Sequence, residues 1–190
     1  MIGTTVNLRP FNDYDENNVI NLFRFSGNVP AERGQFVTII QDGWKNDQEI
    51  GLLGNAFGFS QNNVVAQRYG TVASVGFAGT GDRPLGMMLY DTREVDENGE
   101  KLLYHPHKAA EMQAVVSGQN VPILTKGIVL LSGIEGNPVA GNLLFCSGVG
   151  LLSINQGGDQ ITAANSIINK VGKALGRKDA QNYCLVKIEL

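Results

Sequence analysis

The chain has 190 residues, a formal net charge of −3, 43% hydrophobic residues, 17% charged residues and 24 glycines. This length suits one domain with an arm, or two small lobes, and it buries enough surface to fold without a metal ion or a disulfide. The acidic balance excludes a global basic field for nucleic acid, and no apolar run approaches the roughly 20 residues of a membrane-spanning helix.

The N-terminal segment, residues 1–18, is polar, rich in Asn and Asp, and contains Pro10. It predicts an extended N-terminal arm ahead of a β-rich domain over residues 19–190. Two interpretations stay open: a disordered end, or a strap that orders on a neighbouring subunit. The first residues also lack the basic and apolar regions of a signal peptide, which predicts a reducing, cytoplasm-like compartment.

Short apolar runs alternate with turn residues from residue 19 onward, which is typical of strands joined by tight turns. We predict strands over residues 19–25, 35–40, 64–69 and 71–77, and the Gly-rich segment 51–59 indicates bulges or close backbone contacts. Residues 87–91 and 100–104 flank Asn98-Gly99, a dipeptide that favours a two-residue turn, so residues 85–104 predict a β-hairpin. Its charged tip is expected in water or against a charged partner.

Helix is expected to be scarce. Residues 107–116 follow Pro106 and predict about two helical turns. Over residues 159–176 apolar side chains recur at helical spacing, whereas Gly172 and Gly176 disfavour a helix. A weak repeat, Asn-Val-Pro followed by a basic residue, Gly and a strand, occurs near residues 28 and 120. It indicates two related lobes, over 19–117 and 118–190, or two similar corners of one barrel.

The sequence contains only incomplete versions of known metal-binding and catalytic motifs. His105 and His107 flank Pro106, but no third ligand is placed to complete a zinc site. Cys146 and Cys184 lie in apolar runs and are expected as buried thiols. These patterns predict a protein that is not an enzyme and has no cofactor. The only basic cluster predicts either a solvated turn or a patch that docks on an acidic protein surface; it comprises Lys170, Lys173, Arg177 and Lys178.

The C-terminal part of the chain carries a resemblance. Residues 118–129 read as strand, turn and strand, residues 171–176 read Val-Gly-Lys-Ala-Leu-Gly, and residues 183–190 alternate apolar and polar side chains after a polar turn. This pattern resembles the tailed-phage capsid decoration (cement) proteins of the small β-barrel type. The resemblance covers residues 118–190, and over residues 19–90 it is limited to the general alternation of short apolar runs and turns. The resemblance makes residues 171–175 a strand, which we prefer to a helix.

The resemblance implies a mainly β fold: an antiparallel β-barrel or β-sandwich with little helix. It also implies a virion protein, made in the host cytoplasm, that sits on the capsid exterior and bridges copies of the major capsid protein. Copies of the chain itself are a further expected partner, with a trimer favoured, whereas nucleic acid and membrane are not. The predicted capsid contacts are Phe11 and Tyr14 in the arm, Glu94, Asp96 and Glu97 at the hairpin tip, and Arg177 and Lys178 in the basic turn.

Three alternatives remain beside the capsid decoration protein. One is another virion component, such as a head-fibre base, a tail subunit or a connector subunit. Another is a β-barrel module that binds a small ligand or a sugar, and such a module is expected to have a concave pocket lined by aromatic side chains. The last is an enzyme whose residues follow no recognised pattern, which is expected to place a titratable group with a shifted pKa in a cleft.

Overall fold

The computed structural model describes residues 6–11, 15–27, 29–40, 73–116, 118–154 and 169–190. The predicted strand over 64–69, the Gly-rich segment 51–59, residues 159–168 and the predicted contact Tyr14 lie outside these ranges.

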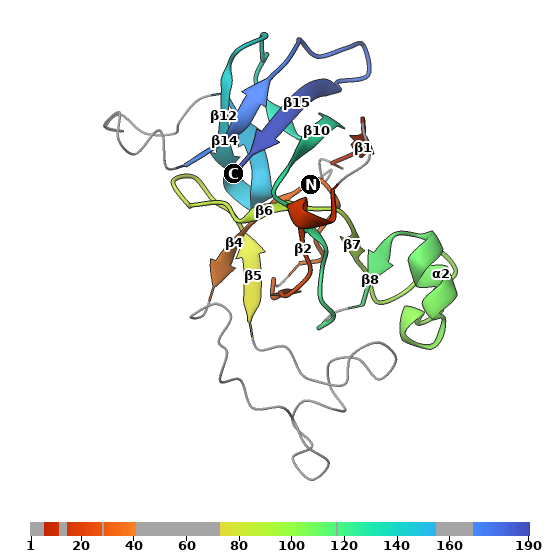
Figure 1. Ribbon diagram of the computed structural model, residues 1–190. Helices are drawn as coiled ribbons and strands as arrows, with labels where there is room; N and C mark the ends of the chain where they lie inside the picture. Colours follow the sequence, from red (N-terminus) through yellow and green to blue (C-terminus); the bar gives the residue numbers. More distant parts are fainter. Residues whose placement is uncertain (1–5, 12–14, 28, 41–72, 117, 155–168) are drawn as a thin grey trace.

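Two antiparallel-rich sheets form the body of the protein (Figure 1). The first has seven strands in the spatial order β1 (Leu8–Pro10), β10 (Lys126–Leu131), β15 (Cys184–Glu189), β14 (Lys170–Ala174), β12 (Leu143–Ser147), β13 (Leu151–Ser153) and β11 (Ile134–Glu135). The second has six strands in the order β2 (Val19–Ile20), β9 (Ile123–Leu124), β6 (Gly86–Met88), β4 (Phe36–Ile40), β5 (Ser74–Phe77) and β3 (Arg24–Phe25). The predicted mainly β, sandwich-like fold is confirmed, and the sheets formed by the described residues do not close into a barrel.

The seven-stranded sheet is strongly curled. Strands β10 and β11 are separated in the chain by only Ser132 and Gly133, although four strands lie between them in the sheet. In a flat sheet those five strand spacings would place them about 24 Å apart. Three residue steps span at most about 11 Å. The sheet therefore bends until its β11 edge returns to the end of β10.

Thr125 is the corner where the chain changes sheets, because it alone separates β9 from β10. Its backbone N–H and its hydroxyl both donate to the carbonyl of Asn18, at 2.8 and 3.0 Å, and its own carbonyl accepts the N–H of Leu190 at 3.2 Å. The six-stranded sheet combines strands from both predicted lobes. Strand β9, from the second predicted lobe, joins the six-stranded sheet, and β1, from the predicted arm, joins the seven-stranded sheet.

The main core lies between the sheets. Phe36, Met87 and Leu124 from the six-stranded sheet pack in one cluster with side chains of the seven-stranded sheet, such as Leu144 and Ile188. Both cysteines belong to this cluster as buried, free thiols, which confirms the prediction for them. Burial raises the pKa of the Cys146 thiol to about 12, so the thiolate needed for reactivity is not formed at neutral pH.

Residues 170–174 form strand β14, so the preferred prediction of a strand there is confirmed. Gly172 is paired with Leu144 on one side and Ile188 on the other. A Cβ atom at Gly172 would lie 2.0 Å from the carbonyl oxygen of Lys187. The close approach of β15 explains why this position holds a glycine.

The described part of the predicted arm is extended but belongs to the domain. Strand β1 pairs antiparallel with β10, and Val6 and Leu8 are buried in the main core. The backbone N–H of Val6 also donates to a carboxylate oxygen of Glu32 at 2.8 Å. Residues 6–11 therefore do not form a strap available to a neighbour. The signal was the alternation of Val6 and Leu8 with polar residues, which fits a strand with one buried face.

The predicted hairpin over residues 85–104 forms only at its turn. Gly99 has φ +82°, whereas Asn98 does not have a positive φ, and the N–H of Gly99 donates to the carbonyl of Asp96 at 3.2 Å. The flanking segments share one bridge, Val95 with Lys101. The return segment instead forms a 3-10 turn, Leu102–Tyr104, and helix α2, Pro106–Glu111. The long hairpin was wrong because Pro106 begins a helix within one residue of the predicted strand.

Strand β7 (Asp91–Thr92) pairs in parallel with β8 (Ala114–Val115), on either side of this turn and helix. Leu102, Ala109 and Ala114 form a small core of their own. Residues between β7 and β8 thus make a compact projection at one side of the two sheets (Figure 1). The predicted helix over 107–116 is shorter than expected, because Gln113 adopts φ +51°.

Candidate protein-binding surface

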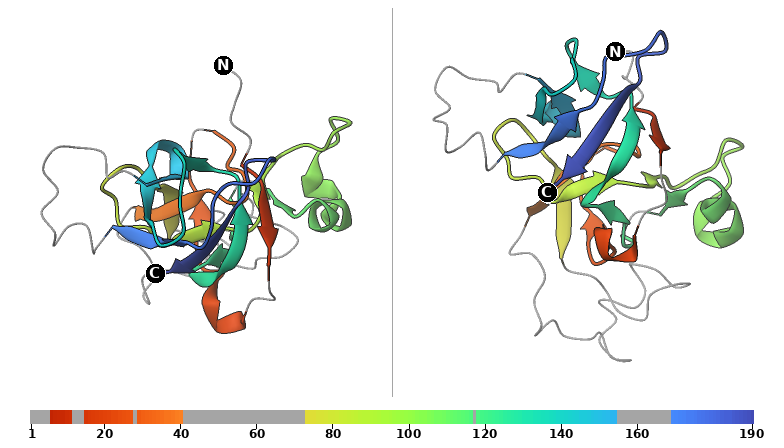
Figure 2. Two further views of the ribbon diagram at one scale, coloured as in Figure 1. Left: turned by 90° about the horizontal axis from the view of Figure 1, so that it is seen from above. Right: turned by 45° about the horizontal axis from the view of Figure 1, so that its top comes forward.

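The outer face of the seven-stranded sheet carries a row of leucines. Leu130 on β10 lies opposite Leu185 on β15, and the N–H of Leu175, just after β14, donates to the carbonyl of Leu185 at 2.8 Å. Arg9 on β1 continues the row beyond Leu130. These side chains alternate with the buried ones on the same strands and are not part of the described core clusters. Figure 2 (right) shows β14, β15, β10 and β1 side by side.

A second row on the same face combines apolar and basic residues. It crosses the sheet from β12 to β10 as Leu143, Lys173, Lys187 and Ile128. Phe11 follows, because its N–H donates to the carbonyl of Ile128. Leu143, Leu175 and Phe11 are 39%, 41% and 58% exposed. We call this surface, formed by the two rows, the outer sheet face.

The charges on the outer sheet face are mostly positive. Lys173 and Lys187 lie directly opposite each other on β14 and β15. Lys187 forms an ion pair with Glu189 at 3.0 Å. The hydrogen bond and charge of Lys187, together with the more distant charges of Lys126 and Lys170, lower the pKa of the Glu189 carboxyl. One carboxylate is thus surrounded by lysines.

The predicted contacts Arg177 and Lys178 lie in the connection between β14 and β15. Arg177 is exposed, whereas the ammonium of Lys178 donates to the carbonyl of Ile134 at 2.6 Å and is half-buried. Nearby, the guanidinium of Arg9 stands 4.6 Å from the ring centroid of Tyr183. The predicted basic cluster is therefore divided: Lys170 and Lys173 belong to β14, and Lys178 holds the connection against β11.

Among the predicted contacts of the hairpin tip, Glu94 and Glu97 are exposed but Asp96 is buried, at 7% exposed. One oxygen of Asp96 accepts the N–H groups of Asn98 and Glu100, at 2.8 and 2.7 Å, and the other accepts the ammonium of Lys108 on α2. Asp96 thus joins the turn to the helix. The capsid contact predicted for Asp96 assumed an exposed carboxylate, and that assumption is wrong because the carboxylate is buried.

The Asp96 interactions predict a pH dependence. The hydrogen bond from Lys108, opposed by burial and supported by the two backbone N–H groups, lowers the pKa of Asp96. A folded-state pKa below the unfolded value of about 3.9 stabilises the protein above that pH, and the contribution is lost as the pH falls through the folded pKa. Thermal melts between pH 7 and pH 2.5 should show a smaller acid-induced loss for Asp96→Asn than for wild type. Glu97→Gln, an exposed change in the same turn, should follow wild type; equal slopes for all three proteins would contradict this role.

A groove of about 330 Å³ lies where β3, β7 and β8 end. Its apolar lining includes Phe25, Val29 and Val116, and Arg93 and Glu94 are the charged residues at its wall. This volume is at the small end of the range for ligand sites, about 300–1,000 Å³. Among the described residues that line it, Phe25 is the one aromatic residue. The groove is therefore a poor match to the aromatic-lined pocket expected of a sugar-binding module.

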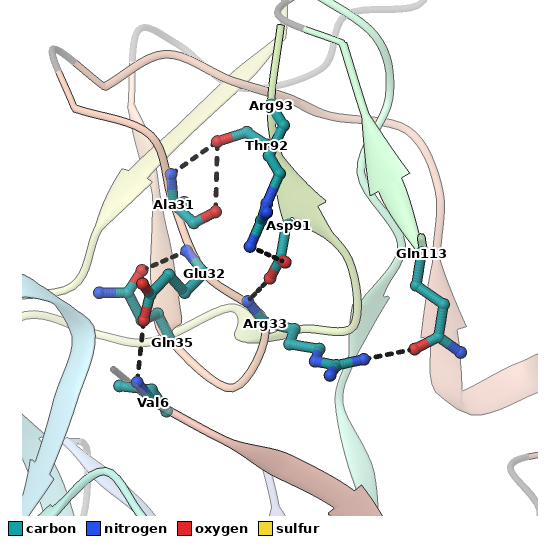
Figure 3. A network of polar contacts seen from close by, with 9 residues as sticks. All are labelled: Val6, Ala31, Glu32, Arg33, Gln35, Asp91, Thr92, Arg93 and Gln113. Atoms are coloured by element: carbon teal, nitrogen blue, oxygen red, sulfur yellow. Dashed lines mark hydrogen bonds and ion pairs between the residues drawn. The ribbon is translucent and has the colours of Figure 1, made fainter. Parts of the chain in front are cut away.

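A network of hydrogen bonds and ion pairs connects the loop over residues 31–35, beside this groove, to β7 and to Val6 in the N-terminal segment (Figure 3). The hydroxyl of Thr92 accepts the N–H of Ala31 at 2.6 Å, and Asp91 accepts the N–H of Arg33 at 2.8 Å. Asp91 also forms an ion pair with Arg93 at 3.2 Å. These contacts join the loop to other parts of the fold, so we assign the network to structural support.

Within the described residues no group of three or more His, Cys, Asp or Glu side chains is arranged to hold a metal ion. His105 and His107 are exposed around the start of α2. No helix in the described part of the chain is long and apolar enough to cross a membrane.

Comparison with known proteins gives no assignment: no family model matches the sequence, and no curated protein matches it significantly.

Phe11, a predicted capsid contact, lies on the outer sheet face, and Lys170 and Lys173 of the predicted basic cluster belong to its strand β14. The row of leucines was not predicted from the sequence. The alternation of Leu185 and Lys187 with buried neighbours did indicate which side of β15 faces outward. The adjacency of Leu130, Leu175 and Leu185 depends on strand order and register, which local patterns do not contain.

Proposed function

We propose that this protein is a capsid decoration protein of a tailed phage, which binds the outside of the head and bridges copies of the major capsid protein. The observation that carries the proposal is the outer sheet face, where exposed apolar side chains are set on a rigid, hydrogen-bonded sheet. Strands β14 and β15, which supply Lys173, Leu185 and Lys187 to that face, are also among the segments that carry the resemblance to decoration proteins.

A rigid sheet face suits adhesion. Apolar side chains on a preformed surface lose little conformational entropy when a partner covers them, and each buried leucine contributes roughly 1.5 kcal/mol or more. On a shell with many equivalent sites, bridging two subunits at once adds avidity without further contacts. Leu143 and Leu175 are the most exposed leucines of this face.

The test is co-sedimentation with undecorated heads of the phage that encodes this chain. Wild-type protein should pellet with the heads. The double variant Leu143→Gln and Leu175→Gln should bind about 100-fold more weakly, because two apolar contacts are lost at the interface.

Ile39→Gln is the matched control. Ile39 is also an exposed strand residue, at 46%, but it lies on β4 in the six-stranded sheet. It should pellet as wild type does. Absence of wild-type protein from the head pellet would refute the decoration function, and equal binding by the double variant would refute this face as the contact.

A further inference from the structure

The paired lysines of the outer sheet face are not explained by the fold. Like charges directly opposite on adjacent antiparallel strands destabilise a sheet, and Lys173 and Lys187 occupy such positions. Glu189 neutralises Lys187 from two residues away on the same strand. Lys173 is exposed and forms no ion pair with another described residue. The free protein therefore keeps an unfavourable charge at the centre of this face.

The surrounding residues extend the positive charge. Lys126 lies opposite Glu189 on the neighbouring strand, Lys170 begins β14, and Arg9 lies at the β1 edge. Residues 118–190 carry six basic and four acidic side chains, whereas residues 1–117 carry nine and fourteen. A chain with net charge −3 thus gathers basic residues on one sheet face, which is the arrangement that attracts an acidic partner.

The proposal, which rests on the proposed function, concerns the chemistry of the partner. We propose that the outer sheet face binds an acidic protein surface on the head shell, with carboxylates set against Lys173 and Lys187 and apolar side chains set against Leu130, Leu175 and Leu185. The leucine row favours a protein over a nucleic acid, since a phosphate backbone gains affinity from lysines but not from leucines. It also gives the protein an orientation, with the curled seven-stranded sheet toward the shell.

This arrangement predicts that replacing Lys173 with glutamate raises the stability of the protein and weakens its binding to heads. In Lys173→Glu the new carboxylate lies opposite Lys187, so the like-charge pair becomes an ion pair. The melting temperature at low salt should rise by about 1–3 °C. Binding to heads at low salt should weaken on the order of tenfold, and wild-type binding should itself weaken as salt is raised from 50 to 500 mM.

Lys101→Glu is the matched control, because it makes the same charge change at an exposed position on the projection. It should leave head binding and its salt dependence unchanged. Retention on immobilised poly-L-glutamate provides a second reading that needs no heads, and wild type and Lys101→Glu should be retained more strongly than Lys173→Glu. Duplex DNA is the third probe, and little binding is expected.

The outcomes separate the two proposals. If wild type does not pellet with heads, the decoration function fails, and the poly-L-glutamate comparison still decides the preference for an acidic partner. If wild type pellets and Lys173→Glu pellets equally well at low salt, the acidic-partner inference is overturned while the decoration function stands. Equal retention of the three proteins on poly-L-glutamate, or duplex DNA binding that Lys173→Glu abolishes, would also overturn the inference.

Discussion

Replacing Gly172 with alanine should lower the free energy of unfolding by about 3 kcal/mol, which corresponds to roughly 10 °C in Tm for a protein of this size. The added methyl group would lie 2.0 Å from the carbonyl oxygen of Lys187. That neighbour is backbone, so relief requires β14 and β15 to separate. The register between β12 and β14 shifts at Leu144 and Phe145, next to Gly172, so a further displacement of β14 would also disturb its pairing with β12.

Gly176→Ala is the control for this prediction. Gly176 lies four residues further along the same segment, and a Cβ atom there would meet nothing within 4 Å. Its melting temperature should stay close to that of wild type. If Gly172→Ala has the same melting temperature as Gly176→Ala, the close approach of β14 and β15 is not required for folding.

Replacing both Val6 and Leu8 with alanine should destabilise the protein by about 4 kcal/mol. Both side chains are buried in the core between the sheets. A Cβ atom on either Gly34 or Gly133 would come within 3 Å of the Val6 side chain, so Val6 packs closely against both glycines. Thermal or urea denaturation measures the effect.

The alternate residues of the same segment provide the control. Asn7 and Arg9 are exposed, and their double substitution by alanine should cost less than about 1 kcal/mol, mostly from the contact of Arg9 with Tyr183. An unchanged Tm for the Val6 and Leu8 double variant would restore the original expectation of a loosely attached arm. Equal losses for both double variants would show that the backbone pairing of β1, and not the burial of its side chains, is what matters.

Local patterns predicted well those features that depend on the residues of a single strand. The alternation in residues 184–189 predicted a half-buried strand, and the apolar surroundings of Cys146 and Cys184 predicted buried thiols; the structure confirms both. The hairpin over residues 85–104 shows where such patterns mislead. Asn98-Gly99 marks a turn correctly, but Asp96 and Lys108 organise the residues around it through contacts made by a helix that follows.

The residues of the candidate binding surface depend on tertiary structure more than the individual strands do. Exposure arguments placed Asp96 at the surface, although its carboxylate is enclosed by its own turn and by α2. They also treated four basic residues as one patch, whereas the structure places them in a strand and in a connection with different partners. A charged residue in a turn is usually solvated, but a hydrogen-bonded carboxylate that caps backbone N–H groups can be buried at little cost.

By itself the sequence determined that this chain forms many short strands, which side chains of the last strand enter the core, and that both thiols are buried. These properties follow from residue type and a spacing of two, which act within one strand. Only the tertiary structure decided that Leu130, Leu175 and Leu185 meet in one row and that Lys173 faces Lys187. Those neighbours are set by strand order, register and the curl of the sheet, which depend on how the whole core packs.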